Sequence, residues 1–358
     1  SSQVAWMDTD LPKGIGVWIT GFYSTLRNNR FNITESCILS DGTHRSLYGV
    51  YVRANNLDIY NNTVIVTGTQ YTYGFVVRAS QNSIYNNNIT VRSVYYSAGV
   101  NIEGNGMKNN YIYDNRINVS AGFEQTDQGN PDVAYGCLIL DFSYGGGEYV
   151  ASISSMENNR YINNTVIADA RQSYAFELYG GVNTQIIGNN MTLTGNYPMG
   201  IGAIGINTTM DNNTIYVDGN SNGSEYSVDY IKPTTVGIYT YWMNEGNIIT
   251  NNTIAVTNGK ALKLDNSKNV LVENNFLLSE DYAYVIEVTN GTNTFKYNAI
   301  MGEGTTEEVI KAEKKYGKGI VENAKNLDKI SQEDLYNVVI NYVDKHYFDN
   351  KKKIYKRK

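Results

Sequence analysis

Carboxylates, arginines and tyrosines are the residues with which this 358-residue chain could do chemistry. Its two histidines, His44 and His346, and its two cysteines, Cys37 and Cys137, lie far apart in the sequence. They offer no cluster for a metal ion and no supported Ser-His-Asp arrangement. Cleavage of a glycosidic bond requires a pair of carboxyl groups, and tyrosine rings beside hydrogen-bonding groups suit sugars. We therefore expect carbohydrate chemistry, without a cofactor or a metal ion.

The candidate site is a set of polar and aromatic residues at matched positions of successive repeats. Arg53, Arg78 and Glu103 occupy the same position in three consecutive repeats. One interpretation is a glycan-binding groove in which Tyr51, Tyr179, Tyr239 and Tyr241 serve as stacking platforms. The alternative is a solvated sheet face on which an Arg–Glu pair contributes little to stability. No residue is predicted to be catalytic, and the predicted ligand-binding residues are Tyr51, Arg53, Arg78, Asn101, Glu103, Asp141, Glu177 and Tyr179.

These residues belong to short segments of alternating apolar residues. Each segment begins with a small residue followed by apolar-x-apolar, as in GVYV at 49–52 and GVNI at 99–102. A second alternating segment follows 12 to 15 residues later. A period of two with many valines and isoleucines predicts β-strands. The repeats show no helical period, so we predict a coil that is built from two strands per turn and no helices.

An asparagine column marks the start of each second segment. Apolar residues stand three positions before it and two positions after it; in the repeat around Asn274 these are Leu271 and Phe276. Asparagine tolerates the left-handed backbone of a tight turn, and identical inward side chains in coils stacked at ~4.8 Å can form a hydrogen-bonded ladder. The predicted ladder consists of Asn29, Asn62, Asn87, Asn115, Asn164, Asn189, Asn213, Asn252, Asn274 and Asn298.

Most steps between these asparagines are 22 to 28 residues, which is typical of a solenoid. The repeats resemble the PbH1 repeats of right-handed parallel β-helix proteins, which include pectate lyases, polygalacturonases and phage tailspikes. Their Asn-rich, Tyr-rich and sequon-rich form most resembles the β-helix modules of adhesin-like surface proteins of methanogenic archaea. The resemblance implies an all-β, right-handed parallel β-helix solenoid of about ten coils. It implies no single function, because this architecture hosts many.

The domain organisation follows from where the repeats begin and end. Residues 1–13 are predicted to cap the first coil, 14–302 to form the β-helix, and 303–358 to form a helical C-terminal cap or linker with a basic tail. Two insertions interrupt the rhythm, the first at 120–134 and 142–157 around a strand at 136–141, and the second at about 218–235. Such insertions are either binding elements or tolerated loops.

Composition and charge favour an extracellular protein. Charged residues make up only 18% of the chain and there are 31 tyrosines, a composition common in extracellular proteins. The net charge of -6 gives no indication of nucleic acid as a partner. No apolar run is long enough to span a membrane. The chain begins with Ser-Ser, so we expect that a signal segment has been removed or the sequence trimmed. Sequons such as those at Asn61, Asn163, Asn212 and Asn251 make a glycoprotein plausible.

The leading functional hypothesis is a secreted or cell-surface, adhesin-like β-helix module. It binds a cell-surface or extracellular glycan, or serves as a structural stalk, and does not cleave its ligand. One alternative is a polysaccharide lyase or glycoside hydrolase, although the chain lacks the paired-Asp motifs of polygalacturonases and the Asp-rich calcium site of pectate lyases. Another alternative is a viral or phage fibre or tailspike component. Self-association is left open.

Overall fold

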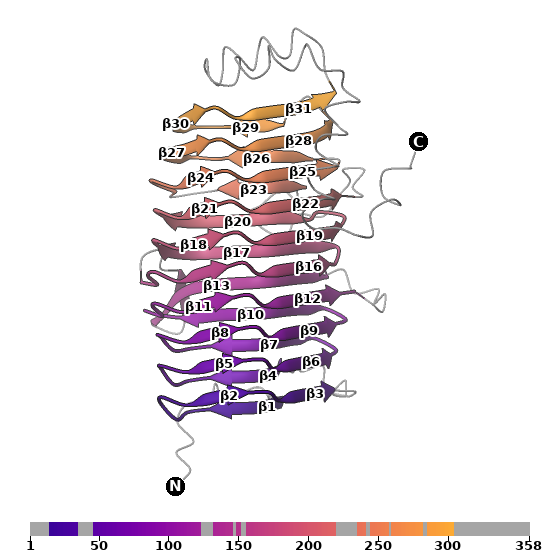
Figure 1. Cartoon of the computed structure of the whole chain (residues 1–358), viewed down its shortest axis with the longest axis vertical. Helices are drawn as coiled ribbons and strands as arrows, with labels where there is room; N and C mark the ends of the chain where they lie inside the picture. Colours follow the sequence, from indigo (N-terminus) through magenta and orange to yellow (C-terminus); the bar gives the residue numbers. More distant parts are fainter. Residues whose placement is uncertain are drawn as a thin grey trace.

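The computed structural model describes residues 14–34, 46–122, 132–145, 148–151, 155–219, 235–240, 244–257, 259–281 and 285–303. These residues form an all-β solenoid of three parallel sheets, through which the chain passes in the same order in every coil (Figure 1). The fold is therefore the predicted parallel β-helix. The predicted N-terminal cap, most of the second insertion and the predicted C-terminal helices and basic tail lie outside the described residues.

Each coil contains three strands, one more than the sequence pattern indicated. The missed strands are those of sheet 2, of which eight have only three residues, too few to reveal a period of two. Sheet 1 consists of β1 (Gly14–Ile19), β4 (Ser46–Val52), β7 (Tyr71–Val77), β10 (Tyr96–Gly104), β13 (Val133–Gly145), β17 (Gln172–Val182), β20 (Met199–Ile206), β23 (Val236–Thr240), β26 (Lys260–Leu264) and β29 (Ile286–Val288).

Sheet 2 consists of β2 (Thr25–Arg27), β5 (Asp58–Tyr60), β8 (Ser83–Tyr85), β11 (Tyr111–Tyr113), β15 (Arg160–Ile162), β18 (Gln185–Ile187), β21 (Thr209–Asp211), β24 (Ile248–Thr250), β27 (Ser267–Glu273) and β30 (Gly291–Lys296). Sheet 3 consists of β3 (Arg30–Thr34), β6 (Thr63–Gly68), β9 (Asn88–Ser93), β12 (Arg116–Ala121), β16 (Thr165–Asp169), β19 (Asn190–Gly195), β22 (Thr214–Gly219), β25 (Thr253–Thr257), β28 (Phe276–Asp281) and β31 (Ala299–Glu303).

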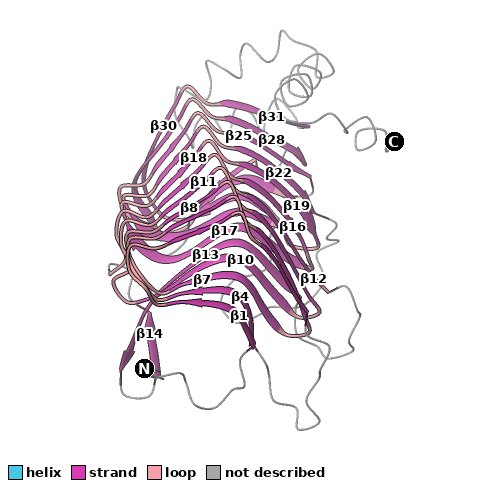
Figure 2. Cartoon of the chain, turned by 60° about the horizontal axis from the view of Figure 1, so that its bottom comes forward, coloured by secondary structure: helices cyan, strands magenta, loops and turns pink. Residues whose placement is uncertain are grey.

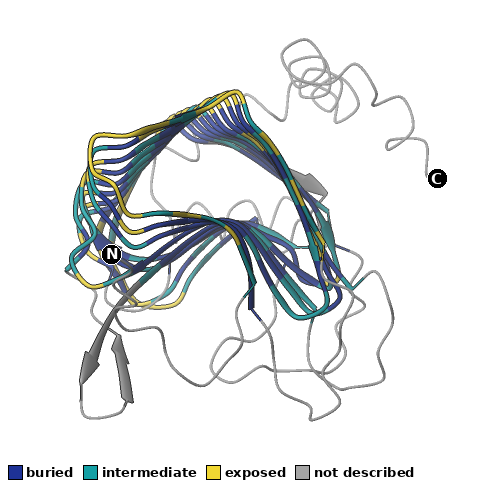
Figure 3. Cartoon of the chain, turned by 90° about the horizontal axis from the view of Figure 1, so that it is seen from below, coloured by how far each residue is buried: buried dark blue, intermediate teal, exposed yellow. Residues whose placement is uncertain are grey.

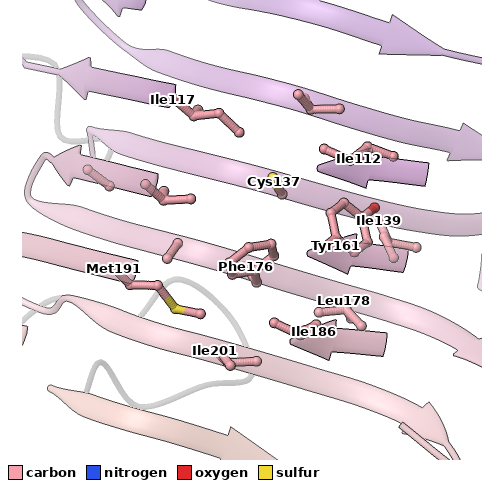
Figure 4. Packing of buried hydrophobic residues seen from close by; sticks show 14 of the residues in the cluster. Ile112, Ile117, Cys137, Ile139, Tyr161, Phe176, Leu178, Ile186, Met191 and Ile201 are labelled. Carbon is pink, nitrogen blue, oxygen red and sulfur yellow. The ribbon is translucent and has the colours of Figure 1, made fainter. Parts of the chain in front are cut away.

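The interior of the coils is a continuous apolar core. Inward residues of the three sheets stack in columns, because the parallel register places equivalent residues of successive coils side by side. In the middle of the stack the rings of Tyr161 and Phe176 pack edge to face, 5.5 Å apart (Figure 4). Cys137 lies in this core, as predicted, and burial raises the pKa of its thiol. Cys37 lies outside the described residues.

The asparagine ladder runs along the corner between sheets 2 and 3, and nine of its ten predicted members are confirmed. Asn87 is typical: its Oδ1 accepts from the N–H and the Nδ2 of Asn62, and its own Nδ2 donates to Ile59 O and to Asn115 Oδ1, at 2.9–3.0 Å. Each ladder asparagine therefore hydrogen-bonds both to the side-chain amide and to a backbone group of a neighbouring coil.

The predicted member Asn274 is wrong, because Asn275 occupies the ladder. Asn275 is buried and bonds to Asn252 on one side and to Asn298 on the other. The inward apolar residues of this repeat are Val272 and Leu277 instead of the expected Leu271 and Phe276. The segment 271–278 is apolar at both alternating sets of positions, so an alignment on apolar residues could be placed one residue off.

The left-handed turn and the ladder are separate positions. The residue just before each ladder asparagine has the positive φ, for example Asn61 (54°) before Asn62 and Asn86 (53°) before Asn87. Expecting one asparagine to do both was wrong, because the left-handed residue points its side chain to solvent whereas the next side chain points inward. The sequons Asn61 and Asn163 are at this exposed position.

A second, shorter ladder lies at the corner between sheets 1 and 2 and was not anticipated. Asn82 N–H donates to Asn110 Oδ1 at 3.1 Å, and Asn110 N–H donates to Asn159 Oδ1 at 3.0 Å. Its members stand five residues before those of the first ladder, and again a left-handed residue precedes each of them. The two corners therefore share one design: an exposed left-handed residue is followed by a buried hydrogen-bonding residue (Figure 3).

The small residue that begins each predicted strand is required by close packing. A Cβ at Gly49 would lie 2.5 Å from Gly74 O and 2.8 Å from Val66 Cγ2 of sheet 3. The same crowding recurs at Gly74 and Gly99 in the next coils. Sheets 1 and 3 converge at this column, and a larger side chain would have no space.

The first insertion contains a β-hairpin. The strand predicted to end at Asp141 continues to Gly145 as β13, and β14 (Glu148–Ala151) pairs with its outer end in antiparallel fashion. Figure 2 shows β14 standing away from the three sheets. The predicted strand end was wrong because the chain leaves the coil without breaking its extended conformation.

Candidate functional site

The outer face of sheet 1 brings together seven of the eight predicted site residues. The register places Tyr51, Asn101 and Glu177 in one column, with Val76 and Leu138 between them. The next column holds Glu103, Leu140 and Tyr179. Arg53 and Arg78 follow β4 and β7 at the corresponding position and donate backbone hydrogen bonds to Ile19 and Val52.

Asp141 is the exception. It pairs with Gly104, one position beyond the column that contains Glu103 and Leu140. It therefore stands in neither outward column. Its predicted place in the groove depended on a strand end that the structure puts four residues later.

The predicted Arg–Glu pair forms, but the face around it is buried instead of solvated. Arg78 Nε donates to Glu103 Oε1 at 2.6 Å, and Asn101 Nδ2 donates to Glu103 Oε2 at 2.7 Å. Glu103 and Asn101 are buried, and Arg78 is half-buried. The interpretation of this face as solvated is therefore wrong, because Glu103 and Asn101 are buried. Truncation of Arg78 would leave a buried carboxylate without its main partner, which costs stability, so such a variant cannot serve as a clean test of binding.

Glu177 is fully buried on the same face. It receives a hydrogen bond from the Tyr179 hydroxyl, and its carboxyl group occupies the space that Gly202 leaves open on the next coil. Burial raises the pKa of Glu177 to about 8, and the Tyr179 hydrogen bond only partly opposes this. The group is therefore protonated at neutral pH, unlike an ordinary surface glutamate.

A chain of aromatic contacts crosses the face along the coil axis, and the sequence analysis missed most of it. Adjacent ring centroids are 4.9–6.1 Å apart. Tyr48, Tyr73, Tyr135 and Tyr174 each stand immediately before the small residue of the strand, a signal that the sequence did contain. We call this set the aromatic strip: Trp18, Tyr51, Tyr48, Tyr73, Tyr96, Tyr135 and Tyr174.

Ring geometry distinguishes the aromatic strip from a second row of tyrosines on sheet 2. In that row Tyr60, Tyr85 and Tyr113 stack nearly parallel, with interplanar angles of 13° and 5° and centroids 4.8 and 4.7 Å apart. The faces of these rings are therefore covered by the neighbouring rings of the same row. The rings of the aromatic strip are mostly tilted, as are Tyr48 and Tyr73 at 39°, so their faces are less completely paired.

Tyr239, which was also expected to be a stacking platform, is already occupied. Its ring is buried, and Lys263 Nζ lies 4.7 Å from its centroid. Lys263 and Lys260 in turn pair with Glu287. Tyr241 lies outside the described residues. The part of sheet 1 that follows β20 therefore offers no open tyrosine platform among the described residues.

Within the described ranges, no group of three or more His, Cys, Asp or Glu side chains could hold a metal ion. The part of the chain that the structure covers also has no helix long and apolar enough to cross a membrane. Neither protein-family models nor curated proteins match this sequence. The parallel β-helix is thus established by the structure, and the likeness to PbH1 repeats and to archaeal adhesin-like modules stays a resemblance.

Proposed function

We propose that this protein is an extracellular, cell-surface module that binds an extended glycan along the outer face of sheet 1 without cleaving it. The aromatic strip is the observation that carries this proposal. Its rings follow the coil axis from Trp18 to Tyr174, and those between Tyr51 and Tyr135 are tilted against one another. Because strands stack at ~4.8 Å, a polymer lying along the axis meets new side chains at every coil.

Polar groups beside the strip supply hydrogen bonds of the kind that orient sugars. Asn101 Oδ1 is buried on this face and has no hydrogen-bond partner among the described residues. A buried acceptor without a donor costs free energy. The Arg78–Glu103 pair and the Tyr179–Glu177 pair flank it with fixed polar groups.

The proposed location has separate support. The sequons at Asn61, Asn163, Asn212 and Asn251 share one exposed corner position, where an attached glycan would meet solvent instead of the core. An adhesin-like glycoprotein, archaeal or otherwise, fits this arrangement. The intact mass of the protein isolated from its natural source tests the point, since an unmodified mass contradicts the glycoprotein part.

Replacement of Tyr73, whose ring is tilted against both of its neighbours, by leucine tests the binding proposal. Leucine keeps the apolar contact but removes the ring and its hydroxyl, so retention on the immobilised polysaccharide that binds the unmodified protein should weaken by about tenfold. The panel comprises a β-linked glucan, chitin and polygalacturonate, each with and without Ca²⁺. Tyr85→Leu on sheet 2 is the matched control and should bind normally. Equal retention by both variants would place the ligand elsewhere, and no retention by the unmodified protein would favour a structural stalk.

A second candidate function is polysaccharide cleavage, and Glu177 is the observation that favours it. A carboxylic acid that stays protonated at neutral pH can act as a general acid. Glu103 would be the second carboxyl group. The two lie on β17 and β10, two coils apart, so strand stacking alone separates them by ~9–10 Å, at the upper limit for an inverting hydrolase. Both carboxyls are also buried, which favours binding over cleavage.

Product analysis separates the two functions. The same polysaccharides are incubated with the protein and assayed for new reducing ends and for unsaturated products. We expect neither. If either accumulates and Glu177→Gln abolishes it, the protein is an enzyme and the non-catalytic proposal is wrong.

A further inference from the structure

The first coil presents three of the four exposed aromatic side chains among the described residues. Phe22 is 61% exposed and Tyr23 is 82% exposed, and both lie in the turn that follows β1. Trp18, at 36%, stands on β1 itself. Inside the aromatic strip, by contrast, Tyr48 and Tyr51 are only 6% and 7% exposed. A sugar approaching from solvent can stack on an open ring face, and the open faces are concentrated on this coil.

Tyr23 also has an unfavourable backbone. Its φ is 55°, in the left-handed region that residues with a Cβ avoid. At the same corner the later coils place Asn56, Gln81 and Asn109, and asparagine tolerates the left-handed region better than tyrosine does. Because the Tyr23 side chain is so exposed, packing does not compensate for the strain. Backbone strain that no packing contact offsets is a reason to look for a function.

The exposed aromatics lie on the coil at which the aromatic strip ends. Trp18 contacts Tyr51 edge to face, with centroids 6.1 Å apart, so the strip ends at the first coil and the turn with Phe22 and Tyr23 follows directly. We propose that Trp18, Phe22 and Tyr23 form a subsite, the end patch, which captures the pyranose rings of a glycan before the polymer lies along sheet 1. This inference rests on the proposed function. The occupant is a carbohydrate polymer, recognised through the apolar face of its rings.

Replacement of Tyr23 by asparagine should raise the stability of the protein and weaken its binding to the polysaccharide. Asparagine relieves the left-handed strain, so the melting temperature should rise by a few degrees. Loss of the open ring should weaken retention on the polysaccharide that binds the unmodified protein by about fivefold or more. Tyr297→Asn is the matched control, because Tyr297 is 62% exposed at a left-handed position (φ 53°) of the last coil. That variant should gain stability and keep normal retention.

Phe22→Ala is the second test, since it removes an exposed ring without touching the strained residue. It should weaken retention and leave the melting temperature unchanged. If the unmodified protein is retained and both Tyr23→Asn and Phe22→Ala bind equally well, the end patch is wrong while sheet 1 binding stands. If the unmodified protein is retained on none of the polysaccharides, both proposals fail. Binding to phosphatidylcholine vesicles, or dimerisation that Phe22→Ala abolishes, would likewise overturn the carbohydrate assignment.

Discussion

Replacement of Asn87 by leucine should destabilise the β-helix by about 4 kcal/mol. Leucine fills a similar volume but removes four hydrogen bonds of the ladder. Two of these involve the backbone: Asn62 N–H becomes buried without its acceptor, and Ile59 C=O loses its side-chain donor. The unpaired donor costs about 1–3 kcal/mol, and each of the other lost hydrogen bonds adds about 0.5–1.5 kcal/mol.

The adjacent asparagine is a matched control for this experiment. Asn88 is exposed on sheet 3, and Asn88→Leu should change stability by less than about 0.5 kcal/mol. Urea-induced unfolding at constant pH measures both variants against the unmodified protein. Equal effects at positions 87 and 88 would show that the ladder contributes nothing specific, and the account of the corner between sheets 2 and 3 would have to be abandoned.

Replacement of Glu177 by glutamine should remove a large pH dependence of stability. The pKa of Glu177 is about 8 in the folded protein and near its ordinary value of 4.5 when unfolded. Between these values the folded state binds more protons than the unfolded state, so stability falls as the pH rises. The contribution is fully present below about pH 4.5 and lost above about pH 8. It amounts to at most about 5 kcal/mol.

Melting curves between pH 4 and pH 9 measure this effect. The unmodified protein should lose stability across the interval, whereas Glu177→Gln, which cannot ionise, should keep it and become the more stable protein at pH 8. Glu245→Gln, which makes the same substitution at an exposed position, is the matched control. Parallel profiles for all three proteins would mean that Glu177 is ionised in the folded state and does not stand in a desolvated site.

Sequence reasoning identified the outward columns of sheet 1 but not their surroundings. Tyr51, Arg78 and Glu103 could be placed side by side because the coil repeat alone determines their register. Their burial could not be predicted, since strand alternation reports only which side of a sheet a residue faces. Tyr96 was missed because it does not share the position before the small residue that Tyr73 and three other tyrosines occupy; only its ring contacts with Tyr73 and Tyr135 make it part of the site.

The sequence by itself determined the solenoid, its parallel strands and its asparagine ladder. Those features repeat, so ten imperfect copies reinforce one another, and an error such as Asn274 for Asn275 shifts a single coil without changing the fold. The tertiary structure alone decided three further features: the burial of the Glu177 carboxyl over Gly202, the ring contacts of the aromatic strip and the exposure of the left-handed Tyr23. Each of these depends on contacts between different coils or on the depth of burial, and no periodic signal encodes them.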